Sequence, residues 1–127
     1  MNHTPTIAVV DDDNGVRMSL SSLLRSLGYE VRAYGSGPEF LDDQAAGDPD
    51  CMITDVQMAP MTGDQLQGAL IAAGRRFPLI FMTAFPTEAA RQRLLGLGAC
   101  AYLDKPVDGE AMARCVAEAL RRDLAAR

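Results

Sequence analysis

Five short runs of β-forming residues alternate with stretches of helical periodicity, and this alternation limits the possible folds more than any other feature of the chain. The runs cover residues 7–10, 30–34, 51–54, 79–82 and 101–103. The first, third and fourth runs are apolar almost throughout, which is typical of strands covered on both faces. Strands that alternate with helices in this way predict an α/β fold, with helices on both faces of a parallel sheet.

The stretches between these runs carry the spacing and the capping residues of helices. The first stretch has one apolar stripe at helical intervals, formed by Val16, Leu20, Leu23, Leu24 and Leu27. Gly28, Gly74 and Gly98 stand where three of the helices are expected to end, and Asp108 stands where the last is expected to begin. A chain of 127 residues suits a single domain over residues 1–127, and we expect regular structure from about residue 6 to about residue 124.

Composition excludes several classes of function. The formal net charge is −5, from 17 acidic and 12 basic side chains, which disfavours direct binding of nucleic acid. No apolar run reaches the roughly 18 residues of a membrane span, and the N-terminus lacks the pattern of a signal peptide, so we expect a cytoplasmic protein without membrane contact. The only histidine, His3, lies where the terminus is expected to fray, which argues against a histidine base or a histidine-bound metal. Three cysteines without a C-x-x-C pair are expected to be reduced and largely buried.

Polar residues gather where the predicted strands end. Asp11 and Asp12 follow the first run, Asp55 the third and Thr83 the fourth, while Lys105, the only lysine, lies just beyond the fifth. In a parallel sheet these positions meet at one edge, where ligands bind. Carboxylates without histidine or cysteine suit Mg²⁺, and a carboxylate beside Mg²⁺ can attack a phosphoryl group. The Lys105 amine and the Thr83 hydroxyl would then face the negative charge of the transferred phosphoryl group. Together these residues predict phosphoryl transfer to an aspartate.

These residues resemble the receiver domain of two-component response regulators. The resemblance covers residues 7 to about 120 and rests on Val9-Val10-Asp11-Asp12, on Asp55 with Met58 and Gly63, on Met82-Thr83-Ala84 and on Lys105-Pro106. It implies a flavodoxin-like three-layer sandwich whose five parallel strands run in the order 2-1-3-4-5. Residues 82–106 are similar to receivers of the nitrogen-fixation regulator type.

The resemblance assigns a chemical role to each strand-end residue. Asp55 would be the phosphoacceptor, and Asp12 and Asp55 would bind Mg²⁺ or Mn²⁺ directly, with Asp11 acting through water. The backbone carbonyl of Gln57 would be a further metal ligand, which leaves that side chain free to vary. Lys105 would pair with the phosphoryl oxygens.

The resemblance also implies a switch. Thr83 would move its hydroxyl to the phosphoryl group, Tyr102 would turn inward as Thr83 leaves its place, and the backbone N–H of Ala84 would reach the phosphate. The surface of the fourth helix, fifth strand and fifth helix would change as a result. The domain would assist its own phosphorylation and dephosphorylation without being a conventional enzyme.

The implied partners are proteins. A sensor histidine kinase or a phosphotransfer protein would dock beside the first helix and present a phosphohistidine. The changed surface would bind a downstream protein target or an output domain, and phosphorylation could drive formation of a homodimer.

Two features depart from the family pattern. The family usually has proline directly after Met58, whereas here Ala59 intervenes before Pro60, and a proline also restrains the residue that precedes it. Gln57 and Phe85 stand two positions beyond the acceptor and the switch threonine, at the expected mouth of the site. We expect bulky Phe85 to hinder the attack of water and to lengthen the lifetime of the phosphoryl group.

Three other functions compete with this interpretation. Asp11 and Asp13 also resemble the D-x-D loop of haloacid-dehalogenase-like phosphatases, with Asp11 as nucleophile and Asp13 as general acid/base, although Gly15 departs from that pattern. A cap of the first helix is the preferred interpretation of Asp13 or Asn14. A phosphate-independent pseudo-receiver that only binds a partner is the second alternative. A flavin carrier is the third, and is disfavoured because carboxylates after the first strand would repel the flavin phosphate.

Overall fold

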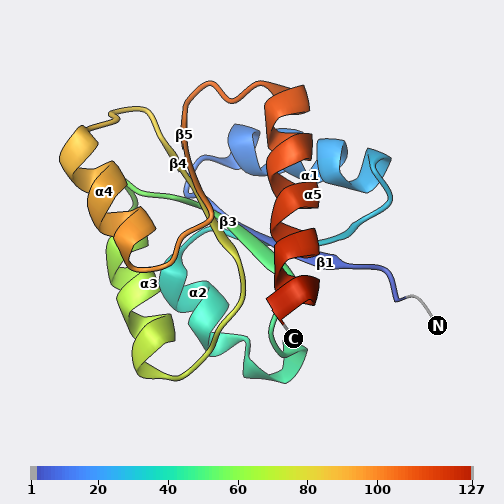
Figure 1. Ribbon diagram of the computed structural model, residues 1–127, viewed down its shortest axis with the longest axis horizontal. Coiled ribbons are helices and arrows are strands. Elements are labelled where there is room, and N and C mark those ends of the chain that lie inside the picture. The colour runs from blue at the N-terminus through green and yellow to red at the C-terminus, as the bar shows by residue number, and fades with distance from the viewer. Residues whose placement is uncertain (1–2, 127) are drawn as a thin grey trace.

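The computed structural model describes residues 3–126 as one five-stranded parallel sheet flanked by helices (Figure 1). In chain order the elements are β1 (Thr6–Val10), α1 (Asn14–Ser26), β2 (Glu30–Tyr34), α2 (Gly37–Asp42), the short 3₁₀ helix η1 (Gln44–Ala46), β3 (Cys51–Asp55), α3 (Gly63–Ala72), β4 (Leu79–Thr83), α4 (Glu88–Gly96), β5 (Ala101–Asp104) and α5 (Gly109–Ala126). The strands lie in the order β2-β1-β3-β4-β5, which confirms the flavodoxin-like topology.

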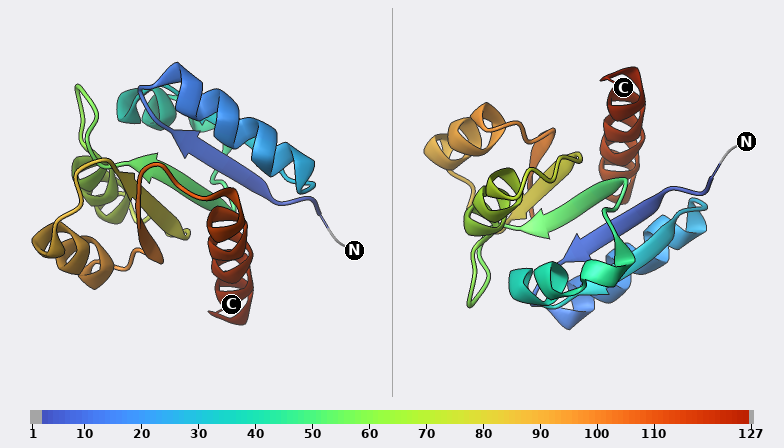
Figure 2. Two further views of the ribbon diagram at one scale, coloured as in Figure 1. Left: turned by 90° about the horizontal axis from the view of Figure 1, so that it is seen from above. Right: turned by 90° about the horizontal axis from the view of Figure 1, so that it is seen from below.

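Two apolar layers hold the helices against opposite faces of the sheet (Figures 1 and 2). Alternate residues of each buried strand point to opposite faces, so Ile7 and Val9 of β1 join one layer while Ala8 and Val10 join the other. The first layer includes residues of α1 and α5, and the second includes residues of α2, α3 and α4. Burial of this apolar surface supplies the main driving force for the fold.

Side-chain caps begin the helices where the sequence indicates. Asp13 accepts a hydrogen bond from the backbone N–H of Val16 at the start of α1, as expected for a capping residue. Asp108 accepts one from the backbone N–H of Ala111 at the start of α5. The positive φ angles of Gly28, Gly74 and Gly98 end α1, α3 and α4, because residues with a Cβ rarely adopt that conformation.

Three details differ from the sequence-based expectations. The ring of His3, expected in a frayed terminus, lies 3.1 Å from the Asp50 carboxylate, which also accepts a bond from the backbone of Thr6. Leu27, expected in the apolar stripe of the first helix, is 44% exposed, because it follows the last turn of α1 and lies off the buried stripe.

The third difference concerns the cysteines. All three are free, but only Cys51 is buried, whereas Cys100 and Cys115 are half-buried. Within residues 3–126, no helix is both long enough and apolar enough to cross a membrane.

Candidate functional site

Two buried carboxylates share one ammonium group at the carboxyl edge of the sheet. Asp11 follows β1 and is fully buried, and Asp55 ends β3 with only 5% of its surface exposed. Lys105 Nζ lies 2.9 Å from Asp11 Oδ2 and 2.9 Å from Asp55 Oδ2. The backbone N–H of Lys105 donates to the carbonyl of Thr83, which fixes the start of the β5–α5 loop against β4. Three strands thus bring Asp11, Asp55 and Lys105 together.

The second oxygen of each carboxylate is held by its own loop. Asp11 Oδ1 accepts a hydrogen bond from the backbone N–H of Asp13 at 2.9 Å. Asp55 Oδ1 accepts one from the backbone N–H of Gln57 at 3.2 Å. Both carboxylates are therefore oriented before any ligand arrives.

Exposed Asp12 completes an acidic cluster with these two residues. One carboxylate oxygen from each of Asp11, Asp12 and Asp55 lies within 4.8 Å of the others. An all-oxygen donor set of this kind matches the preference of Mg²⁺ or Mn²⁺, which are commonly held by one or two carboxylates with water or phosphate oxygens. The residues present therefore fit a divalent metal ion.

Burial sets the electrostatics of the cluster. Burial raises the pKa of Asp55 above its usual value, and the charge of Asp11 adds to this, while the hydrogen bond from Lys105 opposes it. For Lys105, burial alone would lower the pKa, but the hydrogen bonds and charges of Asp11 and Asp55 together raise it. The amine is consequently a permanent cation at neutral pH.

Thr83 ends β4 beside this cluster and is fully buried. Its hydroxyl donates a hydrogen bond of 2.6 Å to the side-chain Oε1 of Gln57 and accepts one of 3.0 Å from the backbone N–H of Phe85. The side chain of Gln57, for which the sequence predicted no role, therefore binds the candidate switch hydroxyl. Ala84 follows Thr83 and is exposed.

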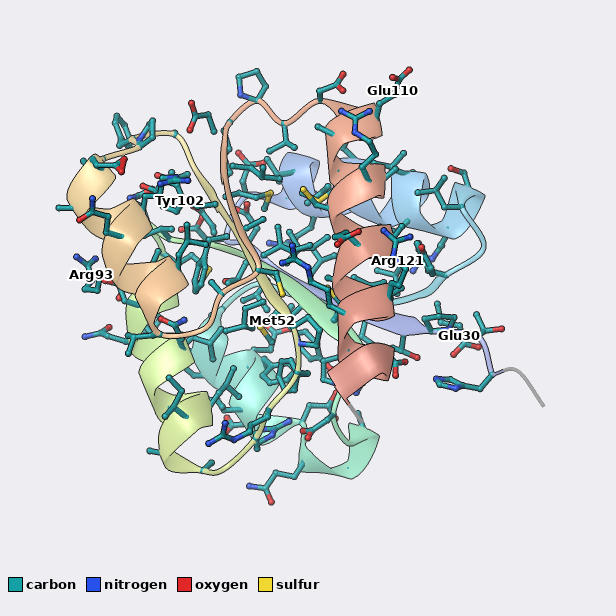
Figure 3. The ribbon with its side chains drawn as sticks, viewed as in Figure 1. Glu30, Met52, Arg93, Tyr102, Glu110 and Arg121 are labelled. Atoms are coloured by element: carbon teal, nitrogen blue, oxygen red, sulfur yellow. The ribbon has the colours of Figure 1, made fainter. Side chains whose placement is uncertain are left out.

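Tyr102 of β5 lies beside α4 (Figure 3). Its half-buried ring packs against the core layer that contains Leu94, and its hydroxyl accepts a hydrogen bond of 3.1 Å from the backbone N–H of Thr87. Thr87 is the residue that caps α4. Tyr102 thus connects β5 with the beginning of α4, while Thr83 is bonded to the β3–α3 loop.

The β3–α3 loop projects from the carboxyl end of the sheet (Figure 2, in green). Met58 is buried, Ala59 and Pro60 are exposed, and the Ala59–Pro60 peptide bond is cis, as is Lys105–Pro106. The loop returns to the sheet at Gly63, where a Cβ atom would lie 2.4 Å from the carbonyl oxygen of Asp55. Only glycine allows so close an approach between the start of α3 and the acceptor residue.

Arg17 also contributes to the site, although the pattern of polar residues at the strand ends does not predict it. Arg17 of α1 donates a hydrogen bond of 2.7 Å to the backbone carbonyl of Asp11 and another of 3.0 Å to the side chain of Asn14. The only sequence feature that could have indicated Arg17 is its position one helical turn after the cap residue Asp13. The carboxylate of Asp13 itself is engaged in capping α1.

Comparison with known proteins identifies the family. The model of the response regulator receiver domain matches residues 7–117. The chain belongs to the response regulator receiver family. Receiver domains of this family are signalling domains of two-component systems, as the resemblance of the sequence predicts.

Curated relatives and solved structures agree with this assignment. The receiver domain is 36% identical over 122 residues to the transcriptional regulatory protein TdiR of Thauera aromatica, covering 94% of this chain and 54% of TdiR. It is 36% identical over 116 residues to the transcriptional regulatory protein FixJ of Azorhizobium caulinodans, covering 91% of this chain and 55% of FixJ, which is compatible with the predicted subtype. The chain thus spans about half the length of these relatives.

The fold also matches solved receiver structures. A CheY-like receiver domain protein from Methanospirillum hungatei superposes with a TM-score of 0.91 at 23% identity, covering 98% of this chain and all of the other. At this identity the likeness concerns the fold alone.

Proposed function

We propose that this receiver domain accepts a phosphoryl group on Asp55 from a phosphohistidine of a sensor histidine kinase or of a phosphotransfer protein. The observation that carries the proposal is the position of Lys105 Nζ, 2.9 Å from both the Asp55 and the Asp11 carboxylates. An ammonium group held beside a nucleophilic carboxylate can neutralise the charge of an incoming phosphoryl group.

Asp12, Asp55 and the backbone carbonyl of Gln57 would hold Mg²⁺ or Mn²⁺, with Asp11 contributing through water. When bound, the ion supplies positive charge to the phosphoryl oxygens. The clustering of the three carboxylates supports this donor set, since three anions beside the single ammonium of Lys105 leave an excess of negative charge that a divalent cation would balance.

In the proposed transfer, a carboxylate oxygen of Asp55 forms the new bond to phosphorus. The bond between phosphorus and the histidine nitrogen breaks, and its electron pair stays on the imidazole. Lys105 pairs with the phosphoryl oxygens, and the Thr83 hydroxyl and the backbone N–H of Ala84 donate hydrogen bonds to them. Thr83 is suitably placed for this role, because it is anchored at the end of the strand next to β3.

The proposed output is a change in the surface formed by α4, β5 and α5. The hydrogen bond that the Tyr102 hydroxyl accepts from the backbone N–H of Thr87, the cap of α4, supports a link between the aromatic ring and this helix. Movement of Thr83 toward the phosphoryl group would let Tyr102 turn inward and release Thr87. The altered surface would bind a downstream protein, an output domain or a second copy of this chain, while the kinase docks beside α1.

The capping role of Asp13 disfavours the haloacid-dehalogenase alternative. That mechanism needs Asp13 as a general acid/base, whereas its carboxylate accepts the backbone N–H of Val16.

The proposal is tested by intact-mass measurement after incubation with acetyl phosphate, with and without Mg²⁺. The wild type should gain the mass of one phosphoryl group only when Mg²⁺ is present, and Asp55→Asn should gain none. A wild type that binds Mg²⁺ but gains no mass would overturn the proposal in favour of a phosphate-independent binding module. A gain that persists in Asp55→Asn and is lost in Asp11→Asn would favour the phosphatase-like alternative.

A further inference from the structure

The hydroxyl of Thr83 is already committed to a partner. A threonine hydroxyl has one proton to donate, and in Thr83 this proton is directed to Oε1 of Gln57 over 2.6 Å. The oxygen in turn accepts the backbone N–H of Phe85 at 3.0 Å, which holds it in place at the end of β4. The hydroxyl can therefore donate to a new acceptor only after it has left Gln57.

Gln57 is hydrogen-bonded both to the phosphoacceptor Asp55 and to the switch residue Thr83. Its backbone N–H donates to Asp55 Oδ1, while its side chain accepts from Thr83, which lies 26 positions away in the sequence. One residue of the β3–α3 loop thus bridges the phosphoacceptor carboxylate and the hydroxyl of the neighbouring strand. The side chain is itself exposed, so it can move into solvent without unpacking the core.

We propose that Gln57 is a positioning residue whose side-chain amide holds the Thr83 hydroxyl in the position it has before phosphorylation. We call this hydrogen bond the latch. The inference rests on the proposed function, in which Thr83 donates to the phosphoryl group. The Gln57 amide and the phosphoryl oxygens then compete for the same proton. The hydrogen bond between Thr83 and Gln57 has to break before the Thr83 hydroxyl can stabilise the phosphorylated state.

The latch lowers the apparent affinity of the site for a phosphoryl group. The apparent affinity falls in proportion to the fraction of molecules that are competent to bind. A hydrogen bond that is present only in the state that does not bind therefore lowers the apparent affinity by a constant factor. A neutral hydrogen bond of this kind corresponds to a factor of about two to ten. The penalty also favours the resting conformation of the switch in the absence of a kinase.

The geometry distinguishes this role from simple occlusion of the site. Methionine has nearly the length and bulk of glutamine but no carbonyl acceptor, so Gln57→Met removes the latch and keeps the mouth of the site filled. Valine has the shape of threonine without the hydroxyl, so Thr83→Val removes the proton that is latched. If the latch is real, Gln57→Met should act only where the Thr83 hydroxyl is present.

The test measures Mg²⁺-dependent binding of beryllofluoride, a phosphoryl mimic, by ¹⁹F NMR titration of four proteins: wild type, Gln57→Met, Thr83→Val and the double variant. Gln57→Met should bind beryllofluoride about two- to tenfold more tightly than wild type. The same substitution should change affinity by much less in the Thr83→Val background. Thr83→Ala serves as a second background if the valine variant is unfolded by circular dichroism.

Other outcomes overturn the latch. Weaker binding in Gln57→Met would mean that the amide assists the phosphoryl group, and an equal effect in both backgrounds would mean that it acts without Thr83. Either result would leave the proposed function standing, because the wild type would still bind the mimic. A wild type that binds Mg²⁺ but no beryllofluoride would overturn the proposed function and the latch together.

Discussion

Lys105 Nζ lies 2.9 Å from Oδ2 of Asp55, although the two residues are 50 positions apart in the sequence. Despite this cation, the pKa of Asp55 is raised, because burial and the charge of Asp11 outweigh the stabilising hydrogen bond. The ionised acceptor therefore lowers the stability of the folded state. This cost is consistent with a site built to receive a cation and a phosphoryl group, not to stabilise the fold.

The raised pKa predicts a pH-dependent difference between the wild type and Asp55→Asn without metal. A folded-state pKa above the unfolded value of about 3.9 means that the stability contributed by this group is present below that value and is lost as pH rises through the folded pKa. Asparagine does not titrate. The stability advantage of Asp55→Asn over wild type should thus be larger at neutral pH than at about pH 4. Urea unfolding in EDTA measures it, and an advantage that is constant or grows on acidification would contradict this account.

Asp12→Asn should weaken Mg²⁺ binding by about tenfold or more, since even outer-shell changes at metal sites cost this much. Asp13→Asn is the matched control, because Asp13 is adjacent in sequence but caps α1, and asparagine caps equally well. Isothermal titration calorimetry of the three proteins gives the affinities. Equal losses in both variants would indicate a general charge effect in place of a specific ligand.

Gly63→Ala should destabilise the domain by about 1–3 kcal/mol, as expected for overpacking against atoms that cannot move. The new Cβ would lie 2.4 Å from the carbonyl oxygen of Asp55 and 3.0 Å from Cα of Val56. Gly68→Ala, in the same helix, meets no atom within 4 Å and should stabilise the domain by up to about 1 kcal/mol. Urea unfolding compares the two, and similar effects of both substitutions would refute the close approach.

Phe85→Ala should shorten the lifetime of the phosphoryl group. Phe85 is 72% exposed and its backbone N–H donates to the Thr83 hydroxyl, so the residue lies next to the candidate switch. We expect its ring to screen the site from water. The decay of phosphorylated protein after removal of acetyl phosphate, followed by intact mass, should be faster in the variant. Phe85→Leu, which keeps an apolar side chain, should fall between the two. Decay in Phe85→Ala at or below the wild-type rate would show that the ring does not protect the bond.

Much of the fold follows from the apolar pattern of the sequence. β3 and β4 each extend one residue beyond their apolar runs, to Asp55 and Thr83, because the backbone pairing continues after the side chains turn polar. In these two strands apolarity therefore marks the interior, and the functional residues Asp55 and Thr83 occupy the last position. The order of the strands could be expected only from the family resemblance, since parallel pairing leaves no local signal.

The contacts of the loops could not be predicted in the same way. The bond between Thr83 and Gln57 depends on the course of the β3–α3 loop and on one side-chain rotamer. Likewise, the bond from Arg17 to the Asp11 carbonyl depends on how α1 leaves the sheet. Residue types and spacing identify which groups gather at an edge, whereas the partners that each group selects there are decided by tertiary packing.

The central claim is that Asp55 is the residue that receives the phosphoryl group. Borohydride reduces an aspartyl phosphate to homoserine, so treatment of the acetyl phosphate-labelled protein, followed by proteolysis and peptide mass spectrometry, maps the acceptor directly. The account predicts homoserine at position 55 in the presence of Mg²⁺ and unchanged aspartate at positions 11, 12 and 13. Homoserine at position 11, with Asp55 unmodified, would contradict it.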